Sequence, residues 1–194
     1  MTTIPDQPGD FFRTFIPERF AAMKDSLAGK SSSGSMAFKV GDAGQWSFRV
    51  TNGELKIEEG MQDDVILQVN VSEEDFKPLF VQAAQISGDA VRPEQQVLAF
   101  KGLTVDEQKA NLVRGIQGTV AFIVQDGAAS RRVSITPGKG TPKLDTPDCR
   151  LECAMTDFLD MQLGKVVPMQ LAMSGKIKIV GNAQIPMALS GVLA

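Results

Sequence analysis

Apolar and polar residues alternate in four stretches in the first part of the chain, a pattern typical of strands with one buried face. The stretches cover residues 36–40, 46–50, 55–57 and 65–71. Glycine-containing turns separate the first three, and Asn52-Gly53 is the residue pair that tight β-hairpins favour. The pattern therefore predicts a meander followed by a fourth strand.

A helix is expected before the meander, within residues 10–27, because apolar residues recur there at helical spacing. Pro17 suits the first helical position, where no backbone N–H is needed. Phe11, Phe12 and Phe15 precede it and are expected to fix this segment onto the core. The alternative is that they form an exposed patch for a partner protein.

Capping signals predict three further helices. Ser72 offers its hydroxyl to the first turn of the helix after the fourth strand. Thr104–Glu107 has the spacing of a capping box in a helical region over 92–115, with Leu112 on the apolar face. Thr156 is expected to cap a helix in the last part of the chain.

The remaining segments are predicted to alternate between strands and helices. Residues 120–124 are apolar on both faces, which indicates a central strand. The hairpin that follows is expected to be looser and wetter, because Pro142 argues for an edge strand or a loop. A short helix at 168–173, a strand at 176–180 and an apolar helix at 185–193 are expected to follow.

Two sequence patterns occur twice, at a constant offset of 84 positions. Gly34–Val40 matches Gly118–Val124, with Gly, Ala, Phe and Val in the same places, and Val65–Val71 matches Cys149–Met155. A repeat of this kind indicates duplicated structural units. We therefore expect an internally duplicated protein.

Composition restricts the function further. The chain has 194 residues, 43% of them hydrophobic, a formal net charge of −3 and a pI near 5.1, so nucleic acid is an unlikely partner. No apolar run is long enough to span a bilayer, and residues 1–9 do not resemble a secretory signal. We expect a soluble protein of a bacterial-type cytoplasm.

The chain contains no histidine, the side chain that most often transfers protons near neutral pH and binds transition metals. This absence excludes Ser-His-Asp and Cys-His sites within the chain and disfavours an enzyme. We expect no catalytic residues, no metal site and no cofactor.

Three other groups of residues were weighed as sites. Cys149 and Cys153 occupy the repeat positions of Val65 and Val69, and on one strand they lie about 13 Å apart, so packing is favoured over a metal pair or a disulfide. Residues 137–143 are glycine-rich and basic, but they lack the spacing of a phosphate-binding Walker loop, so a turn is favoured. The acidic runs at 58–59 and 73–75 are interpreted as solvated faces or a helix start. In and near the glycine-rich segment 137–143, four basic side chains could still attract the phosphate groups of an acyl-CoA: Arg131, Arg132, Lys139 and Lys143.

The residues from Asp148 to Leu193 resemble the sterol carrier protein family, the type-two sterol and lipid carrier domain. They combine a strand, Thr156-Asp-Phe-Leu, Gly164, the run Met173–Asn182 and a closing apolar helix. The segment from Asp10 to Phe76 looks like the front half of the same family. The resemblance implies an α+β fold, in which helices cover a mostly antiparallel sheet.

The resemblance and the repeat together divide the chain into two parts. Residues 1–117 are expected to hold the N-terminal helix, an incomplete first copy and a helical insert. Residues 118–194 are expected to hold the second copy, with the C-terminal strand and helix. The first copy departs from the family pattern, because it has no clear counterpart of the strand at 176–180.

The resemblance also implies noncatalytic binding or transfer of fatty acids, acyl-CoA or sterol-like molecules in an apolar tunnel between the sheet and the C-terminal helices. Methionines are frequent near the end of the chain, and their unbranched side chains adapt to variable apolar shapes. The alternative is that they fill gaps in an ordinary core. The residues expected to bind the ligand are Phe158, Met161, Met173, Ile177, Ile179 and Met187.

A second interpretation belongs to another class of protein: an accessory or dimerisation module that docks onto a partner enzyme through a sheet edge and the N-terminal phenylalanines. The expected partner under the first interpretation is an apolar small molecule, without stable membrane insertion. Under the second it is a partner enzyme or another copy of the chain.

Overall fold

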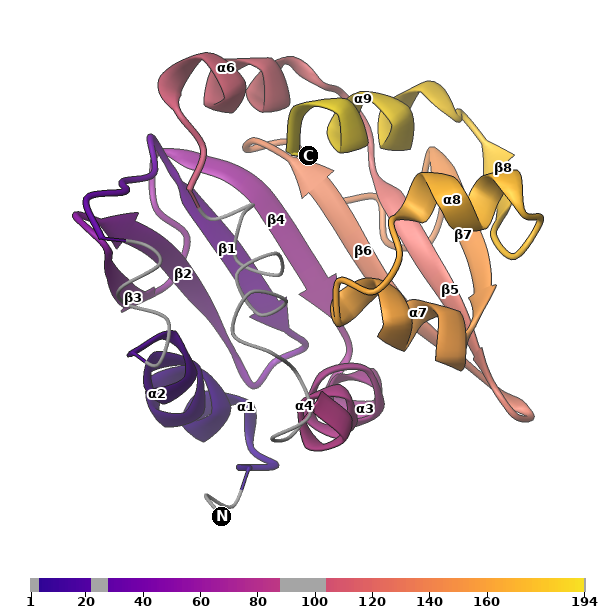
Figure 1. Ribbon diagram of the computed structural model, residues 1–194, viewed down its shortest axis with the longest axis horizontal. Coiled ribbons are helices and arrows are strands. Elements are labelled where there is room, and N and C mark those ends of the chain that lie inside the picture. Colours follow the sequence, from indigo (N-terminus) through magenta and orange to yellow (C-terminus); the bar gives the residue numbers. More distant parts are fainter. Residues whose placement is uncertain (1–3, 22–27, 88–103, 194) are drawn as a thin grey trace.

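The structure, a computed structural model, describes residues 4–21, 28–87 and 104–193. Within them eight strands form one sheet in the order β3-β2-β1-β4-β6-β5-β7-β8 (Figure 1). Two neighbouring pairs, β1 with β4 and β5 with β7, are parallel, and the other five are antiparallel. The predicted class, an α+β protein with a mostly antiparallel sheet, is confirmed.

The N-terminal helix is continuous and consists of α1 (Pro8–Asp10), the π-helical turn η1 (Phe11–Phe15) and α2 (Ile16–Ala21). Pro17 therefore lies inside the helix, and its predicted place at the first helical position is wrong. Proline lacks the N–H that an interior helical residue donates, and here it lies two residues after a turn whose hydrogen-bond pattern already departs from the α-helix. Residues 22–27 of the predicted helix lie outside the described residues.

The four predicted strands of the first part are present. They are β1 (Ser35–Val40), β2 (Gly44–Thr51), β3 (Glu54–Glu59) and β4 (Val65–Val71). Asn52 and Gly53 have φ angles of 51° and 76°, the left-handed backbone that makes this pair favourable in a tight hairpin.

The predicted cap after β4 is also present. The Ser72 hydroxyl accepts a hydrogen bond from the backbone N–H of Asp75, 3.0 Å away. The helix that begins there comprises α3 (Glu73–Phe76), η3 (Lys77–Val81) and α4 (Gln82–Ser87).

The next described helix, α6 (Glu107–Gly115), begins after Asp106. The Asp106 carboxylate accepts a hydrogen bond from the N–H of Lys109 at 2.8 Å, so the predicted capping box starting at Thr104 is wrong. A carboxylate here satisfies an unpaired N–H and lies at the positive end of the helix dipole. Residues 92–103 of the predicted helical region fall outside the described residues, and residues 104–106 are described but are not helical.

The predicted apolar face of α6 is also partly wrong. Leu112 is 54% exposed, whereas Ala110 and Val113 are buried together with Val105. The helix thus buries a face that is rotated away from Leu112.

The second group of strands begins with β5 (Val120–Asp126), which lies between β6 (Ala129–Pro137) and β7 (Cys149–Ala154), as expected for a central strand. The expectation of a loose and wet hairpin holds for one side only: β6 pairs with β4 in the middle of the sheet, whereas residues 138–148 form a largely exposed connection instead of a second strand. Pro142 lies in the connection after β6, as its loop interpretation requires.

The chain continues with α7 (Met155–Gln162), α8 (Pro168–Met173), β8 (Lys178–Gly181) and α9 (Gln184–Leu193). The N-cap of α7 is Ala154, which has no capping side chain, so the predicted cap by Thr156 is wrong. Ala154 is the last residue of β7, so the strand passes directly into the helix. Strand β8 begins two residues later than predicted.

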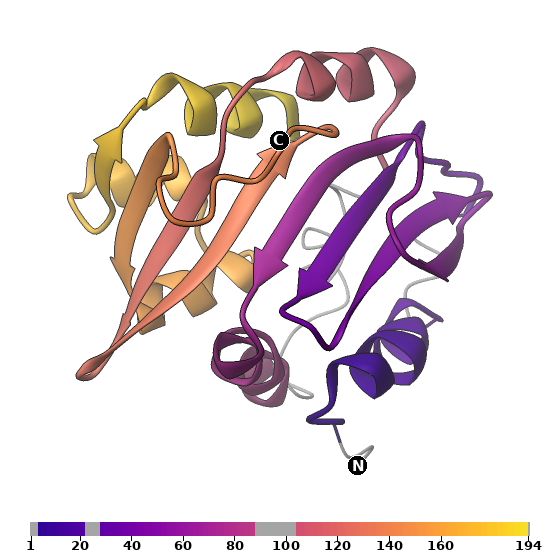
Figure 2. The same cartoon turned by 180° about the vertical axis from the view of Figure 1, so that it is seen from behind.

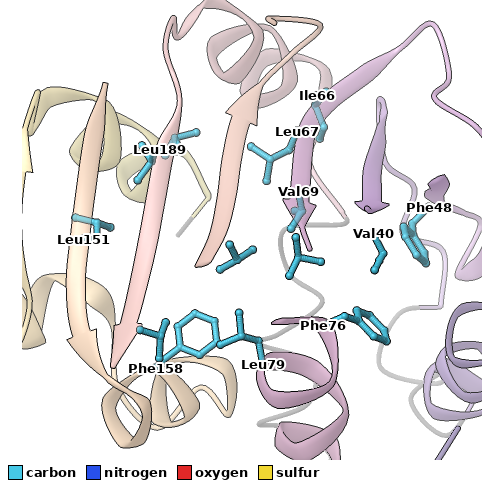
Figure 3. Packing of buried hydrophobic residues seen from close by; sticks show 14 of the residues in the cluster. Val40, Phe48, Ile66, Leu67, Val69, Phe76, Leu79, Leu151, Phe158 and Leu189 are labelled. Carbon is cyan, nitrogen blue, oxygen red and sulfur yellow. The ribbon is translucent and has the colours of Figure 1, made fainter. Parts of the chain in front are cut away.

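The two faces of the sheet differ in chemistry. Phe38, Val69 and Phe122 belong to an apolar face, and the helices of both halves except α6 lie on this side (Figures 1 and 2). Figure 3 shows side chains from both halves, among them Leu79 of η3 and Phe158 of α7, in one apolar layer against the strands. The opposite face carries polar side chains, among them Ser47, Asn70 and Ser134. None of the described helices lies over it (Figure 2).

The local strand arrangement occurs twice. β1 pairs with β2 antiparallel and with β4 parallel, and β5 pairs with β6 and β7 in the same two ways. The register is different, because Phe38 lies opposite Trp46, whereas its repeat counterpart Phe122 lies opposite Val133 and not opposite Ser130, which follows Trp46 by 84 positions. Internal duplication and the boundary at residue 117 remain predictions.

Candidate functional site

Aromatic rings fill the apolar face over the first half of the sheet. The ring centroid of Phe12 lies 4.8 Å from that of Trp46, 5.0 Å from Phe38 and 5.3 Å from Phe48. These are the distances of directly packed aromatic pairs. The N-terminal helix therefore fills this half with side chains of the chain itself.

The same packing decides one earlier alternative. Phe11, Phe12 and Phe15 are only 4%, 3% and 6% exposed. The interpretation that they form an exposed docking patch is therefore wrong, and the expectation that they fix the N-terminal segment onto the core is confirmed.

The second half of the apolar face is covered mainly by aliphatic side chains, under α7, α8 and α9. We refer to its buried members as the C-terminal apolar layer. None of them carries a charge at neutral pH, and one of them, Phe158, has a ring contact with Phe122 at 5.8 Å. The members are Val120, Val124, Cys149, Leu151, Cys153, Phe158, Leu171, Ile177, Ile185 and Leu189.

The side chains of this layer differ from the rings of the first half in their freedom to rearrange. Two half-buried methionines, Met155 and Met161, pack against this layer, and methionine has three rotatable side-chain bonds where phenylalanine has two. Flexible thioether side chains adapt to variable apolar shapes. The second half is therefore the part of the molecule better suited to a variable apolar ligand.

The structure brings together only some of the predicted site residues. Phe158 and Ile177 are each 5% exposed and belong to the C-terminal apolar layer. Met161, which is half-buried and lies in α7 like Phe158, packs against the same core. Met173, Ile179 and Met187 are 83%, 38% and 54% exposed, so they lie on the outside of the molecule.

Several members of the layer were not predicted as site residues. Leu151 lies between Cys149 and Cys153 on the same face of β7, and strand alternation could have identified it. Leu189 follows Ile185 by four residues in α9, which is helical spacing. The sequence interpretation favoured methionines and so missed these leucines.

Both cysteines are free, buried thiols, as the packing interpretation expects. Burial raises the pKa of Cys149. Burial, with a smaller contribution from the negative charge of Asp157, raises the pKa of Cys153 to about 11. At neutral pH both side chains are uncharged and form part of an apolar wall.

The glycine-rich connection between β6 and β7 serves the fold. Gln68 donates from Nε2 to two carbonyl oxygens of this connection, 2.8 and 2.9 Å away. Lys143 donates to Asp148 at 2.7 Å, a hydrogen bond that lowers the pKa of that carboxyl, and Lys139 pairs with Asp63. With these groups engaged, the turn interpretation is supported over a phosphate cradle.

The acidic run after β4 is likewise engaged in structure. Nη1 of Arg131 lies 3.1 Å from Glu74 and 3.4 Å from Asp75. The Glu73 carboxylate accepts a hydrogen bond from the backbone N–H of Asp42 at 3.0 Å. These carboxylates join the helix start to neighbouring turns and strands.

Two searches of the described residues bear on the kind of site. No group of three or more His, Cys, Asp or Glu side chains in these parts of the chain has the arrangement of a metal site. No helix among the same residues has the length and apolar character needed to cross a bilayer.

The α+β sheet thus has one helix-covered apolar face, and the C-terminal apolar layer beneath α7–α9 contains no charged side chain. A model of the SCP-2 sterol transfer family matches residues 99–194, which include α6 and all of the second half. The chain therefore belongs to the SCP-2 sterol transfer family, through about half of its length.

Curated relatives agree with this membership. The chain is 34% identical to human sterol carrier protein 2 over 104 residues, which are 49% of this chain and 19% of the human protein. It is 31% identical to the protein of the same name from Oryctolagus cuniculus over 128 residues, 60% of this chain and 23% of the relative. The chain thus spans about a fifth of the length of these relatives.

Solved structures show a more distant likeness. Sterol carrier protein 2 from Yarrowia lipolytica, in its apo form, is 24% identical, with a TM-score of 0.34 over 55% of this chain and 91% of the other. Sterol carrier protein-2 like-3 from Aedes aegypti is 20% identical, with a TM-score of 0.35 over 52% and 95% of the two chains. The superposition is partial in both cases.

Proposed function

We propose that the protein binds and transfers apolar lipids without catalysing a reaction, and that the ligand lies in the C-terminal apolar layer. The observation that carries this proposal is the uncharged wall under α7–α9, within the residues that the family model matches. Fatty acids, acyl-CoA and sterol-like molecules are the ligand class.

The chemistry of the layer supports this ligand class. Each buried methylene contributes about 0.8 kcal/mol, so about ten methylenes contribute about 8 kcal/mol before the costs of association and ordering. Phe158, Met161 and Ile177 are the predicted site residues placed to contact such a tail. Met173, Ile179 and Met187 would contact it only near the surface, where it enters between α8 and β8 or α9.

The second half is the proposed site because the first half is already filled. The rings of the N-terminal helix occupy the apolar face over β1 and β2 at direct packing distances. A ligand there would have to displace Phe12 from its three aromatic neighbours in β1 and β2. We therefore propose one ligand for each chain.

A noncatalytic role fits the side chains available. The chain has no histidine, and the two thiols in the layer are held in the neutral form, which is the unreactive form of cysteine. No side chain of the layer is therefore suited to proton transfer or nucleophilic attack near neutral pH.

The test is a pair of methionine substitutions with a fluorescent fatty acid as the probe. Met161→Asp places a carboxylate beside the layer, so we expect the probe to bind at least about tenfold more weakly, equivalent to about 1.4 kcal/mol. Met61→Asp is the matched control, because Met61 is 44% exposed and lies between β3 and β4. The Met61→Asp variant should bind the probe with the same affinity as the unsubstituted protein.

Circular dichroism is needed to show that both variants keep their fold. Equal affinities of the two folded variants would contradict the proposed site.

Native mass spectrometry of the protein after gentle purification separates the proposal from the accessory-module interpretation: a bound lipid supports the proposal, and a lipid-free stable oligomer contradicts it.

A further inference from the structure

Four buried side-chain atoms among the described residues have no hydrogen-bond partner. One is Nε1 of Trp46, on the apolar face, and one is Nε of Arg131, whose Nη1 still pairs with two carboxylates. The other two are Nδ2 of Asn70 and Oγ of Ser134. Buried polar groups are normally paired, so each exception needs an explanation.

Asn70 and Ser134 are also exceptions among the buried polar residues. They are 8% and 1% exposed. The other buried polar side chains of the described residues all form hydrogen bonds: Ser35, Ser47, Gln68, Thr119 and Thr136. The fold therefore satisfies its buried polar groups everywhere except at these two residues.

The two unpaired groups lie at one place in the sheet. Asn70 of β4 and Ser134 of β6 are direct partners in the antiparallel pairing of these strands. The Cβ atoms of such partners lie about 5 Å apart on the same face. This is the polar face, over which none of the described helices lies (Figure 2).

The connection between β6 and β7 bonds to the neighbours of this pair but not to the pair itself. Gln68, two residues before Asn70 in β4, donates to the carbonyl oxygens of Gly138 and Gly140. Arg132, two residues before Ser134 in β6, donates to a carbonyl oxygen farther along the connection, 2.6 Å away. The unpaired groups lie between these two contacts.

Lys39 places a positive charge beside the pair. It is the partner of Asn70 in the parallel pairing of β1 with β4, so the two strands are about 4.8 Å apart at this point. Its side chain is exposed and forms no ion pair within the described part of the chain. Glu73, beyond the end of β1, is bound to the backbone N–H of Asp42 at 3.0 Å.

The charge on this part of the polar face is the opposite of that of the whole chain. The side chains that β1, β4, β6 and β5 direct to this face include Lys39 and Arg132, and no Asp or Glu. The whole chain has a net charge of −3. Two unpaired polar groups thus lie in a locally positive region, which favours an anion.

We propose that Lys39, Asn70 and Ser134 together bind a phosphate group. An ammonium, an amide and a hydroxyl group supply three donors, and a phosphate group has three terminal oxygens that accept. Half a turn about the last bond of the Asn70 side chain exchanges its oxygen and nitrogen, so the amide can direct Nδ2 toward the anion. Lysine binds phosphate as a point charge.

A phosphate group fits these observations better than a smaller ligand does. A water molecule could pair with Asn70 and Ser134, but it would leave Lys39 unused. A carboxylate has two oxygens for three donors. The inference goes beyond the proposed function, because this site lies on the opposite face of the sheet from the C-terminal apolar layer.

The experiment is a calorimetric titration of the full chain with inorganic phosphate and with glycerol phosphate. We expect saturable binding of one anion per chain, and Lys39→Gln should weaken it at least about tenfold. The matched control is Lys56→Gln, because Lys56 is exposed on the same face, in β3, and also forms no ion pair within the described residues. The control variant should bind as the unsubstituted protein does.

Ser134→Ala tests the buried hydroxyl separately. It should weaken phosphate binding at least about threefold, because one hydrogen bond to the anion is lost. In phosphate-free buffer it should not lower the free energy of unfolding, because this hydroxyl has no partner in the fold. Ser47→Ala is the comparison and should destabilise the protein, because the Ser47 hydroxyl donates to the carbonyl oxygen of Gly60 at 2.6 Å.

Three results would overturn the inference: no saturable binding of either anion, equal weakening by Lys39→Gln and Lys56→Gln, or equal destabilisation by Ser134→Ala and Ser47→Ala. Tighter binding of glycerol phosphate identifies a phosphate ester as the ligand, and tighter binding of inorganic phosphate identifies the free ion. Either order supports the site.

Fluorescent fatty acid binding separates this inference from the proposed function. Saturating phosphate should leave the affinity for the fatty acid unchanged, because the two sites lie on opposite faces of the sheet. Competition between the two ligands would contradict a separate phosphate site. Phosphate binding without any fatty acid binding would leave this site in place and contradict the lipid site.

Discussion

At the scale of single residues, Cys153 links packing to pH. It lies in the C-terminal apolar layer at the repeat position of Val69, and burial is the main cause of its raised pKa, about 11 compared with the usual 9.0. The folded state therefore holds the thiol proton more tightly than the unfolded chain. The resulting stabilisation is present below pH 9 and is lost as the pH rises toward 11.

Cys153→Val should remove this pH dependence, because valine fills the same position in the first half. We expect the free energy of unfolding of the unsubstituted protein to fall more steeply between about pH 9 and 11, by up to about 1.4 kcal/mol per pH unit. Denaturant titrations at several pH values measure the difference, and Cys149 is present in both proteins. Parallel pH curves would contradict the burial of this thiol.

Which individual side chains are buried was harder to predict than which segments are apolar. Leu112 and Val113 are adjacent and similar, yet one is exposed and the other buried. The direction from which a helix approaches its neighbours decides this, and that direction depends on distant parts of the chain. Met173 and Met187 were assigned to the ligand site because methionines are frequent near the end of the chain. Their exposure could not be predicted, because it too depends on how their helices pack.

At the scale of helices and strands, two of the three predicted hydroxyl caps provide a direct comparison. Ser72 accepts the N–H of Asp75, whereas Thr156 lies inside α7 and its helix begins at an uncapped Ala154. Ser72→Ala should destabilise the protein by about 1 kcal/mol, and Thr156→Ala should change its stability little. Chemical denaturation measures both, and equal losses would contradict the helix starts described.

Local patterns were sufficient for most elements of the fold. Alternation identified β1–β4, and Asn52-Gly53 identified a turn, because hairpins depend on neighbouring residues. The place of β6 was not predictable in this way, because its second partner, β4, precedes it by about sixty residues. The prediction that Pro17 begins the helix was wrong because the π-helical turn before it changes the backbone hydrogen-bond pattern, so that the helix can contain a proline in its interior.

At the scale of the whole molecule, one continuous sheet has two differently filled halves. Aromatic side chains of the N-terminal helix close the first half, and aliphatic and thioether side chains cover the second. The sequence was sufficient to predict the α+β class and the family. The join through β4 and β6 and the asymmetry between the halves emerge only from the three-dimensional packing.

The most direct measurement of the central claim is a methyl NMR titration of protein labelled at its methionines, with a sixteen-carbon fatty acid as the ligand and Met→Leu variants for assignment. Met155 and Met161 report on the C-terminal apolar layer, Met36 on the first half and Met61 on the surface. We predict shifts at Met155 and Met161 that saturate at one ligand per chain, with Met36 and Met61 unchanged. Shifts at Met36 alone, or no saturable shift at any methionine, would contradict a lipid site in the second half.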